Sequence, residues 1–181
     1  KNPYWAAQVL VAGQNKKITI KDEKTGKEEA FPVVKDTEKN LKLLADSWRM
    51  AQEINKAIPV LERAAKMSKD GDLYVLLGNL YLFEDRMEDS IRAIEMGLKK
   101  PKVKSRSQAQ LVLGQAHFEL ENFEEAKKQF RAAARDKDKR TKKTANSWIK
   151  YAENEAIRVK NLALRRDFIE KAAAKAQKKN S

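Results

Sequence analysis

Hydrophobic and small residues recur at fixed offsets in three successive stretches between residues 38 and 140. In the second stretch an aromatic residue is followed by Leu-Gly, by Tyr, and then by small, bulky and small residues. These positions are held by Tyr74, Leu77, Gly78, Tyr81, Ser90, Ile94 and Gly97. The third stretch repeats the pattern at Gln110, Leu113, Gly114, His117, Ala126, Phe130 and Ala133, and the first at Leu41, Leu44, Ala45, Trp48, Ala57, Leu61 and Ala64. Such self-similarity predicts a repeat architecture.

Each repeat is expected to form two antiparallel helices joined by a short polar turn. The turns are predicted at residues 52–54, 84–86 and 121–122. Small residues in the pattern lie where two helix backbones cross closely, and large ones fill the gaps beside them. Gly78 and Gly114, 36 residues apart, are therefore interpreted as packing residues. The predicted repeats span residues 38–70, 71–106 and 107–140.

This pattern resembles the tetratricopeptide repeat (TPR). The resemblance implies an all-α fold, a TPR-type helix-hairpin solenoid. The residues outside the repeats add a long C-terminal helix and a small N-terminal β-hairpin to this prediction. Residues 38–155 are also similar to bacterial periplasmic TPR proteins encoded beside a second TonB energy-transduction system, on the runs LKLLADSW, AIPVLERAA and SKDGDL. That narrower resemblance implies a periplasmic protein that assists an envelope complex for iron uptake, with TonB-system components among its partners. A cytoplasmic location is the alternative.

The two ends of the chain depart from the repeat. In residues 1–37, Asn2-Pro3 predicts a helix start and Gly13 its end, and a β-hairpin is expected across residues 17–34 with Gly26 in the left-handed conformation. This region is either a degenerate repeat with an insertion or a separate contact element. Residues 141–181 lack Gly and Pro and predict one long capping helix with a basic extension. The chain begins with Lys1 and not Met, as expected of a fragment or a processed form.

Composition argues against catalysis. The chain has no cysteine, which excludes disulfides, thiolate metal sites and cysteine nucleophiles. The single histidine, His117, occupies an aromatic packing position of its repeat, and no phosphate-binding loop, metal-binding spacing or serine elbow is present. We therefore expect a protein that is not an enzyme and has neither a cofactor nor a metal. Hydrophobic runs are also too short to span a bilayer.

The concave face of a TPR stack offers a groove for a segment of another protein, either an extended peptide or a helix. The groove is lined by one face of the first helix of each repeat. Its predicted partner-binding residues are Val75, Asn79, Leu82, Leu111, Gln115, Phe118 and Ile149. Apolar side chains would take the partner's side chains, and the amides of Asn79 and Gln115 would bond its backbone. Alternatively, the terminal helix or the N-terminal segment folds into the groove and fills it.

The charge of the chain suggests a second kind of function. Of the net charge of +13, residues 137–181 hold ten lysines and four arginines against five acidic residues. The C-terminal helix could therefore bind nucleic acid or an anionic membrane through a basic patch of Lys142, Lys143, Arg158, Arg165 and Arg166. Nucleic acid is the less expected ligand, because no aromatic residues are interleaved with these charges. Self-association through Ile157, Leu164 and Phe168 is a third possibility.

Overall fold

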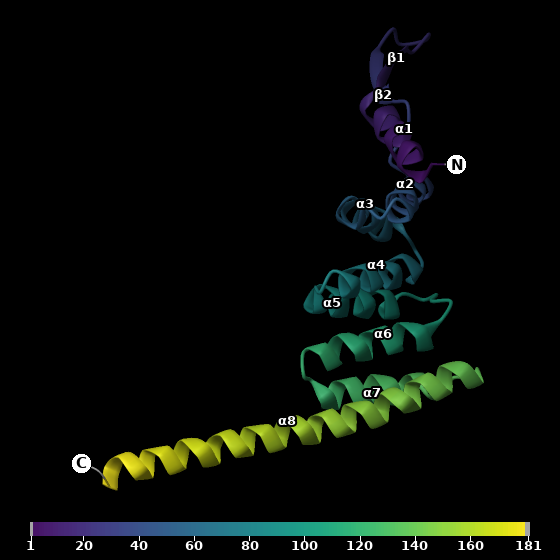
Figure 1. Ribbon diagram of the computed structural model, residues 1–181. Coiled ribbons are helices and arrows are strands. Elements are labelled where there is room, and N and C mark those ends of the chain that lie inside the picture. The colour runs from purple at the N-terminus through teal and green to yellow at the C-terminus, as the bar shows by residue number, and fades with distance from the viewer. Residues whose placement is uncertain (1, 180–181) are drawn as a thin grey trace. The chain divides into compact units, whose positions relative to one another are not determined.

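The computed structural model describes residues 2–179 and is mostly helical (Figure 1). Its elements run in the order α1 (Pro3–Asn15), β1 (Lys17–Lys21), β2 (Glu28–Pro32), α2 (Glu38–Met50), α3 (Ile54–Met67), α4 (Asp72–Phe83), α5 (Met87–Lys99), α6 (Arg106–Glu119), α7 (Phe123–Ala133) and α8 (Lys139–Lys179). The chain divides into an N-terminal part, residues 1–104, and a C-terminal part, residues 105–181. The all-α class is as predicted. The pairs α2/α3 and α4/α5 lie inside residues 38–70 and 71–106, and the pair α6/α7 begins one residue before the range 107–140. No helix among the described residues combines the length and the hydrophobicity needed to cross a membrane.

Helix α1 begins as the sequence predicts but ends later. The side chain of Asn2 caps it by accepting hydrogen bonds from the backbone N–H groups of Tyr4 and Trp5, with Pro3 in the first turn. The helix then continues through Gly13 to Asn15, so the expected end at Gly13 is wrong. Gly13 serves close packing instead, because an added Cβ would lie 2.4 Å from the side chain of Val34.

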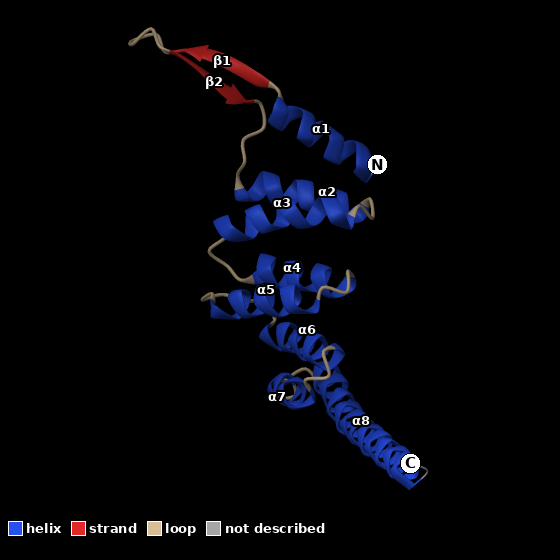
Figure 2. Ribbon diagram, turned by 90° about the vertical axis from the view of Figure 1, so that its left-hand side faces the viewer, coloured by secondary structure: helices blue, strands red, loops and turns tan. Residues whose placement is uncertain are grey.

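Strands β1 and β2 pair antiparallel and form a two-stranded sheet (Figure 2). In this register Ile18 faces Phe31 and Ile20 faces Glu29. The turn between the strands uses Gly26 with φ of 68°, the left-handed conformation that was predicted. Asp22 organises the same turn, since its carboxylate accepts from the backbone N–H groups of Lys24 and Thr25.

The helix pairs α2/α3 and α4/α5 build the core of the N-terminal part, joined there by Ala7 of α1. At the α4/α5 crossing, a Cβ on Gly78 would lie 2.3 Å from the side chain of Ile94, which explains the glycine. Ser90 is fully buried at the same crossing and donates a hydrogen bond of 2.8 Å to the carbonyl of Gly78. The small residues of the repeat thus allow the two helices to touch, as expected.

In the C-terminal part, α6 and α7 form the third pair and the first half of α8 packs against both. The ring of Phe130 is fully buried against Gly114, whose Cβ would lie 2.5 Å from the ring. Trp148 of α8 stacks on Phe130, with centroids 5.4 Å apart and planes at 20°. The long terminal helix therefore closes the aromatic core of this part, and its second half extends beyond α6 and α7 (Figures 1 and 2).

Candidate partner-binding surfaces

Helix α4 carries the candidate surface of the N-terminal part. Its buried side is apolar, with Leu73, Tyr74, Leu77, Leu80 and Tyr81 in the core. The predicted groove residues Val75, Asn79 and Leu82 lie on another face of the helix and are all half-buried. Phe83, at the end of α4, is 74% exposed. Sequence reasoning did not select Phe83, because it lies outside the repeat positions that were considered.

The amide of Asn79 is only partly available. Its Nδ2 donates a hydrogen bond of 2.8 Å to the carbonyl of Val75, one turn earlier in the same helix. An Asn side chain has two N–H donors and an oxygen with two acceptor sites. One donor and the oxygen thus remain for a ligand, and the internal bond holds the side chain in a defined orientation.

The face of α2 that corresponds to the candidate surface of α4 carries charged side chains. Asp46 accepts from Lys42 at 2.6 Å and from Arg49 at 3.4 Å, and all three side chains are at least partly exposed. One carboxylate shared by two cations leaves this surface with a net positive charge. Exposed i,i+3 and i,i+4 pairs of this kind stabilise a helix by only a few tenths of a kcal/mol.

The predicted groove residues of the C-terminal part are placed differently. Leu111 is only 5% exposed and belongs to the core with Phe130, so the prediction that it lines an open groove is wrong. The physical reason is that Leu111 packs in one core cluster with Phe130 of α7 and with Ala145 and Ala152 of α8. Gln115 is half-buried on the same helix.

Phe118 and Ile149 are also drawn into internal packing. The ring of Phe118 lies 5.0 Å from that of Tyr151 and 5.6 Å from that of Trp148, both on α8. Ile149 of α8 is half-buried against the same core. Phe118 therefore contacts the first half of α8 within this part of the chain.

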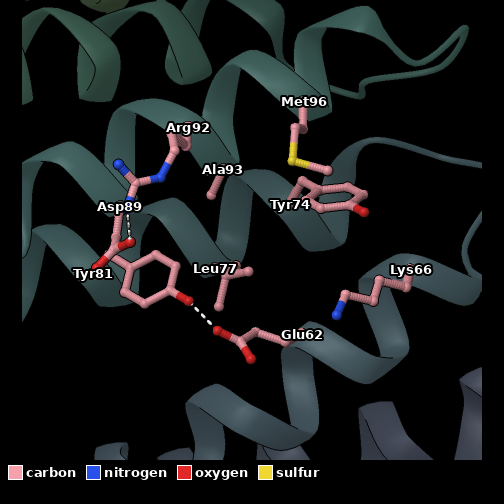
Figure 3. Close-up of a pocket in the computed structure, with 9 residues that line it drawn as sticks. All are labelled: Glu62, Lys66, Tyr74, Leu77, Tyr81, Asp89, Arg92, Ala93 and Met96. Carbon is pink, nitrogen blue, oxygen red and sulfur yellow. Dashed lines mark hydrogen bonds and ion pairs between the residues drawn. The ribbon is translucent and has the colours of Figure 1, made fainter.

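A pocket of about 240 Å³ opens on a different face of the N-terminal part, between α3, α4 and α5 (Figure 3). Its lining residues are Glu62, Lys66, Tyr74, Leu77, Tyr81, Asp89, Arg92, Ala93 and Met96. Leu77 and Ala93 form an apolar floor, and the charged groups stand around it. The repeat pattern selects the tyrosines as packing residues, and no signal in the sequence points to a hollow between α3 and α5.

Both carboxylates of this pocket already have partners within the protein. The Tyr81 hydroxyl donates a short hydrogen bond to Glu62 (Figure 3). Burial, followed by the hydrogen bond and charge of Glu62, raises the pKa of Tyr81 above its usual value. The guanidinium of Arg86 also lies over the Tyr81 ring, 4.4 Å from its centroid.

Asp89 is held by two arginines. Arg86 Nε donates to it at 2.8 Å, and Arg92 makes a short ion pair with its other oxygen. Although burial favours the neutral acid, the hydrogen bonds and charges of Arg86 and Arg92 hold the pKa of the Asp89 carboxyl below its usual range. One carboxylate of the pocket thus accepts a hydrogen bond from Tyr81, and the other is paired with two arginines.

The predicted basic patch does not form a single surface. At 100° per residue, Lys143, Arg158 and Arg165 fall within one sector of α8, whereas Lys142 and Arg166 lie on others. Arg158 is paired with Glu155 through Nε at 2.8 Å. His117 is half-buried on α6. Across residues 2–179 no three His, Cys, Asp or Glu side chains gather in a way that could hold a metal ion.

Comparison with known proteins agrees with this architecture. The family model described as Tetratricopeptide repeat matches residues 107–135. Comparison with curated proteins finds no match. Among solved structures, a MamA structure is similar with a TM-score of 0.58 at 18% identity, covering 78% of this chain and 82% of that one.

Two further solved structures share the fold. The Arabidopsis OM64 TPR domain gives a TM-score of 0.55 at 20% identity, covering 65% of this chain and 94% of that one. The first TPR of Spaghetti (RPAP3), bound to the HSP90 peptide SRMEEVD, gives 0.54 at 14% identity, covering 63% and 91%. Residues 107–135 thus match a tetratricopeptide repeat, and the fold of the chain is the all-α fold of tetratricopeptide-repeat proteins.

Proposed function

We propose that this protein is a non-catalytic adaptor that holds a segment of another protein against α4. The contact surface consists of Val75, Asn79 and Leu82 together with Phe83. The observation that carries the proposal is that α4 is packed on its core side yet leaves a row of apolar side chains partly accessible, ending in a phenylalanine that is 74% exposed. Apolar side chains that gather at the surface commonly mark interaction sites.

The chemistry of the surface defines the partner segment. Val75, Leu82 and Phe83 favour apolar side chains, and the remaining donor and acceptor of Asn79 suit one peptide group of the segment's backbone. A tail recognised chiefly through its carboxylates fits less well, because none of the four residues of this surface is a cation. The RPAP3 structure, which holds a peptide on the same fold, supports peptide capture as a use of this architecture.

Selection from a displayed peptide library tests the proposal. Peptides are selected on the wild-type chain, and their affinities are then measured for Leu82→Glu and for a matched control, Met67→Glu. Leu82 is half-buried and Met67 is exposed, and Met67 ends α3 and lies outside the α4 surface. Leu82→Glu is expected to weaken peptide binding at least about tenfold, because it buries an uncompensated carboxylate against an apolar peptide. Met67→Glu is expected to change the affinity little.

Circular dichroism provides the folding control. Since Leu82 is half-buried, the variant's helicity and urea midpoint are measured beside its affinity. Binding that is unchanged in a folded Leu82→Glu protein would remove α4 as the contact surface. If the selection yields no binders at all, the adaptor proposal itself fails.

From the sequence resemblance alone, we further propose that the adaptor is periplasmic and serves a TonB-type envelope complex. The motifs of residues 38–155 support this proposal. Alkaline phosphatase fused to the product of the complete gene is active only when exported. Inactive fusions with stable protein would exclude the periplasm, and genes unrelated to TonB systems beside this one would remove the link to iron uptake.

A further inference from the structure

The second half of α8 has no neighbour within the C-terminal part. Every side chain from residue 160 to residue 173 is exposed, in contrast to Ala145 and Ala152, which are fully buried in the first half. Figures 1 and 2 both show this half continuing past α6 and α7. A helix that is stable by itself in water needs no large apolar side chains on its surface. This one carries several, so they require another explanation.

Two of these side chains, Leu164 and Phe168, form one row along the helix with Ile157, which lies just before them. Ile157 is 59% exposed, Leu164 58% and Phe168 74%. With Asn161, they follow each other at spacings of four, three and four residues, which is the seam of a coiled coil. A single Asn within such a seam is a known device for fixing the register of two helices. We call Ile157, Asn161, Leu164 and Phe168 the seam.

The residues flanking the seam are mainly basic. Arg158 and Arg165 follow seam residues on one side, and Lys160 and Asp167 precede them on the other. Residues 157–175 as a whole carry six cationic and two acidic side chains. In a coiled coil the flanking positions of two helices face each other, and their charges decide which partner is accepted.

This charge pattern argues against a second copy of the chain. A parallel pair would bring Lys160 of one copy against Arg165 of the other. An antiparallel pair would bring Arg158 against Arg165, and the attraction between Lys160 and Asp167 would at most offset this repulsion. Like charges at these positions disfavour pairing, and opposite charges favour it. We propose that the seam docks an amphipathic helix of another protein that has apolar residues at heptad spacing and Asp or Glu at the flanking positions. This surface is separate from the one proposed on α4.

An anionic membrane is the less suitable occupant. Leu162 and Ile169 form a second apolar row, which is about 120° to 140° around the helix from the seam. Arg158 and Arg165 lie between the two rows, in the middle of the surface that would have to enter the lipid. Helices that lie in a membrane interface keep their cations on the polar face. A facing carboxylate, by contrast, can pair with these arginines at the edge of the seam.

Two synthetic heptad peptides test the proposal directly. Both have Leu at the seam positions, and one has Glu and the other Lys at the flanking positions. Isothermal titration into the full chain is expected to show binding of the Glu peptide and none of the Lys peptide. Binding of both peptides alike, or of neither, would overturn the proposal.

Paired variants then locate the contact. Leu164→Gln with Phe168→Gln is expected to weaken binding of the Glu peptide at least about tenfold, since two apolar side chains leave the seam. The matched control, Leu162→Gln with Ile169→Gln, removes the second row and is expected to change affinity less than about threefold. Equal losses in the two variants would overturn the assignment of the seam.

Charge reversal and two further measurements complete the test. Arg165→Glu is expected to weaken binding of the Glu peptide and to improve binding of the Lys peptide, and an unchanged preference would overturn the charge argument.

Phosphatidylglycerol vesicles that bind the chain through the seam in the absence of peptide binding would show a membrane site instead. Sedimentation that reveals a dimer lost in Leu164→Gln with Phe168→Gln would show a second copy as the occupant. Leu82→Glu is expected to leave peptide binding at the seam intact, which separates this proposal from the one on α4.

Discussion

The contact between Gly114 and Phe130 predicts that Gly114→Ala destabilises the protein. Ala is a better helix former than Gly by about 0.8–1.0 kcal/mol, so Gly114→Ala in an open helix would be stabilising. Here the new methyl would lie 2.5 Å from Phe130, a ring that is fully buried and stacked on Trp148. Overpacking of this kind costs about 1–3 kcal/mol. We therefore expect Gly114→Ala to destabilise the C-terminal part by up to about 2 kcal/mol.

A second substitution, Phe130→Leu, tests whether the contact with the Phe130 ring is what makes Gly114→Ala destabilising. Phe130→Leu alone loses the stacking on Trp148, worth about 0.5–1.5 kcal/mol, and leaves space beside Gly114. The methyl of Gly114→Ala can then occupy part of that space. In a protein that already carries Phe130→Leu, we therefore expect Gly114→Ala to be neutral or stabilising by up to about 1 kcal/mol. The two substitutions should couple by about 1–3 kcal/mol.

Hydrogen exchange measured on fragments of α6 and α7 is the appropriate assay, because it reports the C-terminal part without assuming two-state unfolding of the whole chain. Urea unfolding followed by circular dichroism supplies an independent value. Additive free energies, with Gly114→Ala stabilising in both backgrounds, would refute the reasoning. That result would mean that the Phe130 ring does not rest against Gly114.

Two further predictions concern the hydrogen bonds of Ser90 and of Asp138. Ser90→Ala removes the buried bond to the Gly78 carbonyl and is expected to cost about 1 kcal/mol, measured as faster exchange in α4 and α5; no change would contradict the bond's role. At the start of α8, hydrogen bonds from the Thr141 backbone and hydroxyl hold the pKa of the Asp138 carboxyl below its usual value. The ionised Asp138 carboxylate therefore stabilises the start of α8 fully at a pH above the pKa that Asp138 has in the unfolded chain. This stabilisation is lost as the pH falls through the lower pKa of Asp138 in the folded protein. Exchange of the first turn of α8, corrected for intrinsic rates, should accelerate below about pH 4 in the wild type and change less in Asp138→Ala.

The repeat pattern predicted the fold because each of its positions has one structural use. Gly78 and Gly114 permit close helix crossings, and the polar breaks become turns. The pattern did not reveal that three of those turns would use left-handed residues other than glycine, Gln52, Asp85 and Glu121, with φ of 61°, 55° and 58°. Nor did it reveal the role of Gly13, because its contact with Val34 depends on how the chain returns after the hairpin.

The candidate site was less predictable, because it depends on what each helix packs against. Val75, Asn79 and Leu82 keep the partial exposure expected of a binding face. Leu111 holds the position equivalent to Val75 in the next repeat and is buried. The sequence marks these two positions alike, whereas Leu111 is buried by packing with Ala145 and Ala152 of α8. The pocket beside Tyr81 depends in the same way on the spacing of α3 and α5.

The most direct test of the adaptor proposal asks where a bound peptide lies. A photoreactive benzoylphenylalanine is placed at Phe83, on the α4 surface, and in a second protein at Met96, on the margin of the α3–α5 pocket. With a peptide selected on the wild-type chain, illumination is expected to give a peptide adduct at Phe83 and none at Met96. An adduct at Met96 without one at Phe83 would contradict the account and would assign peptide binding to the pocket.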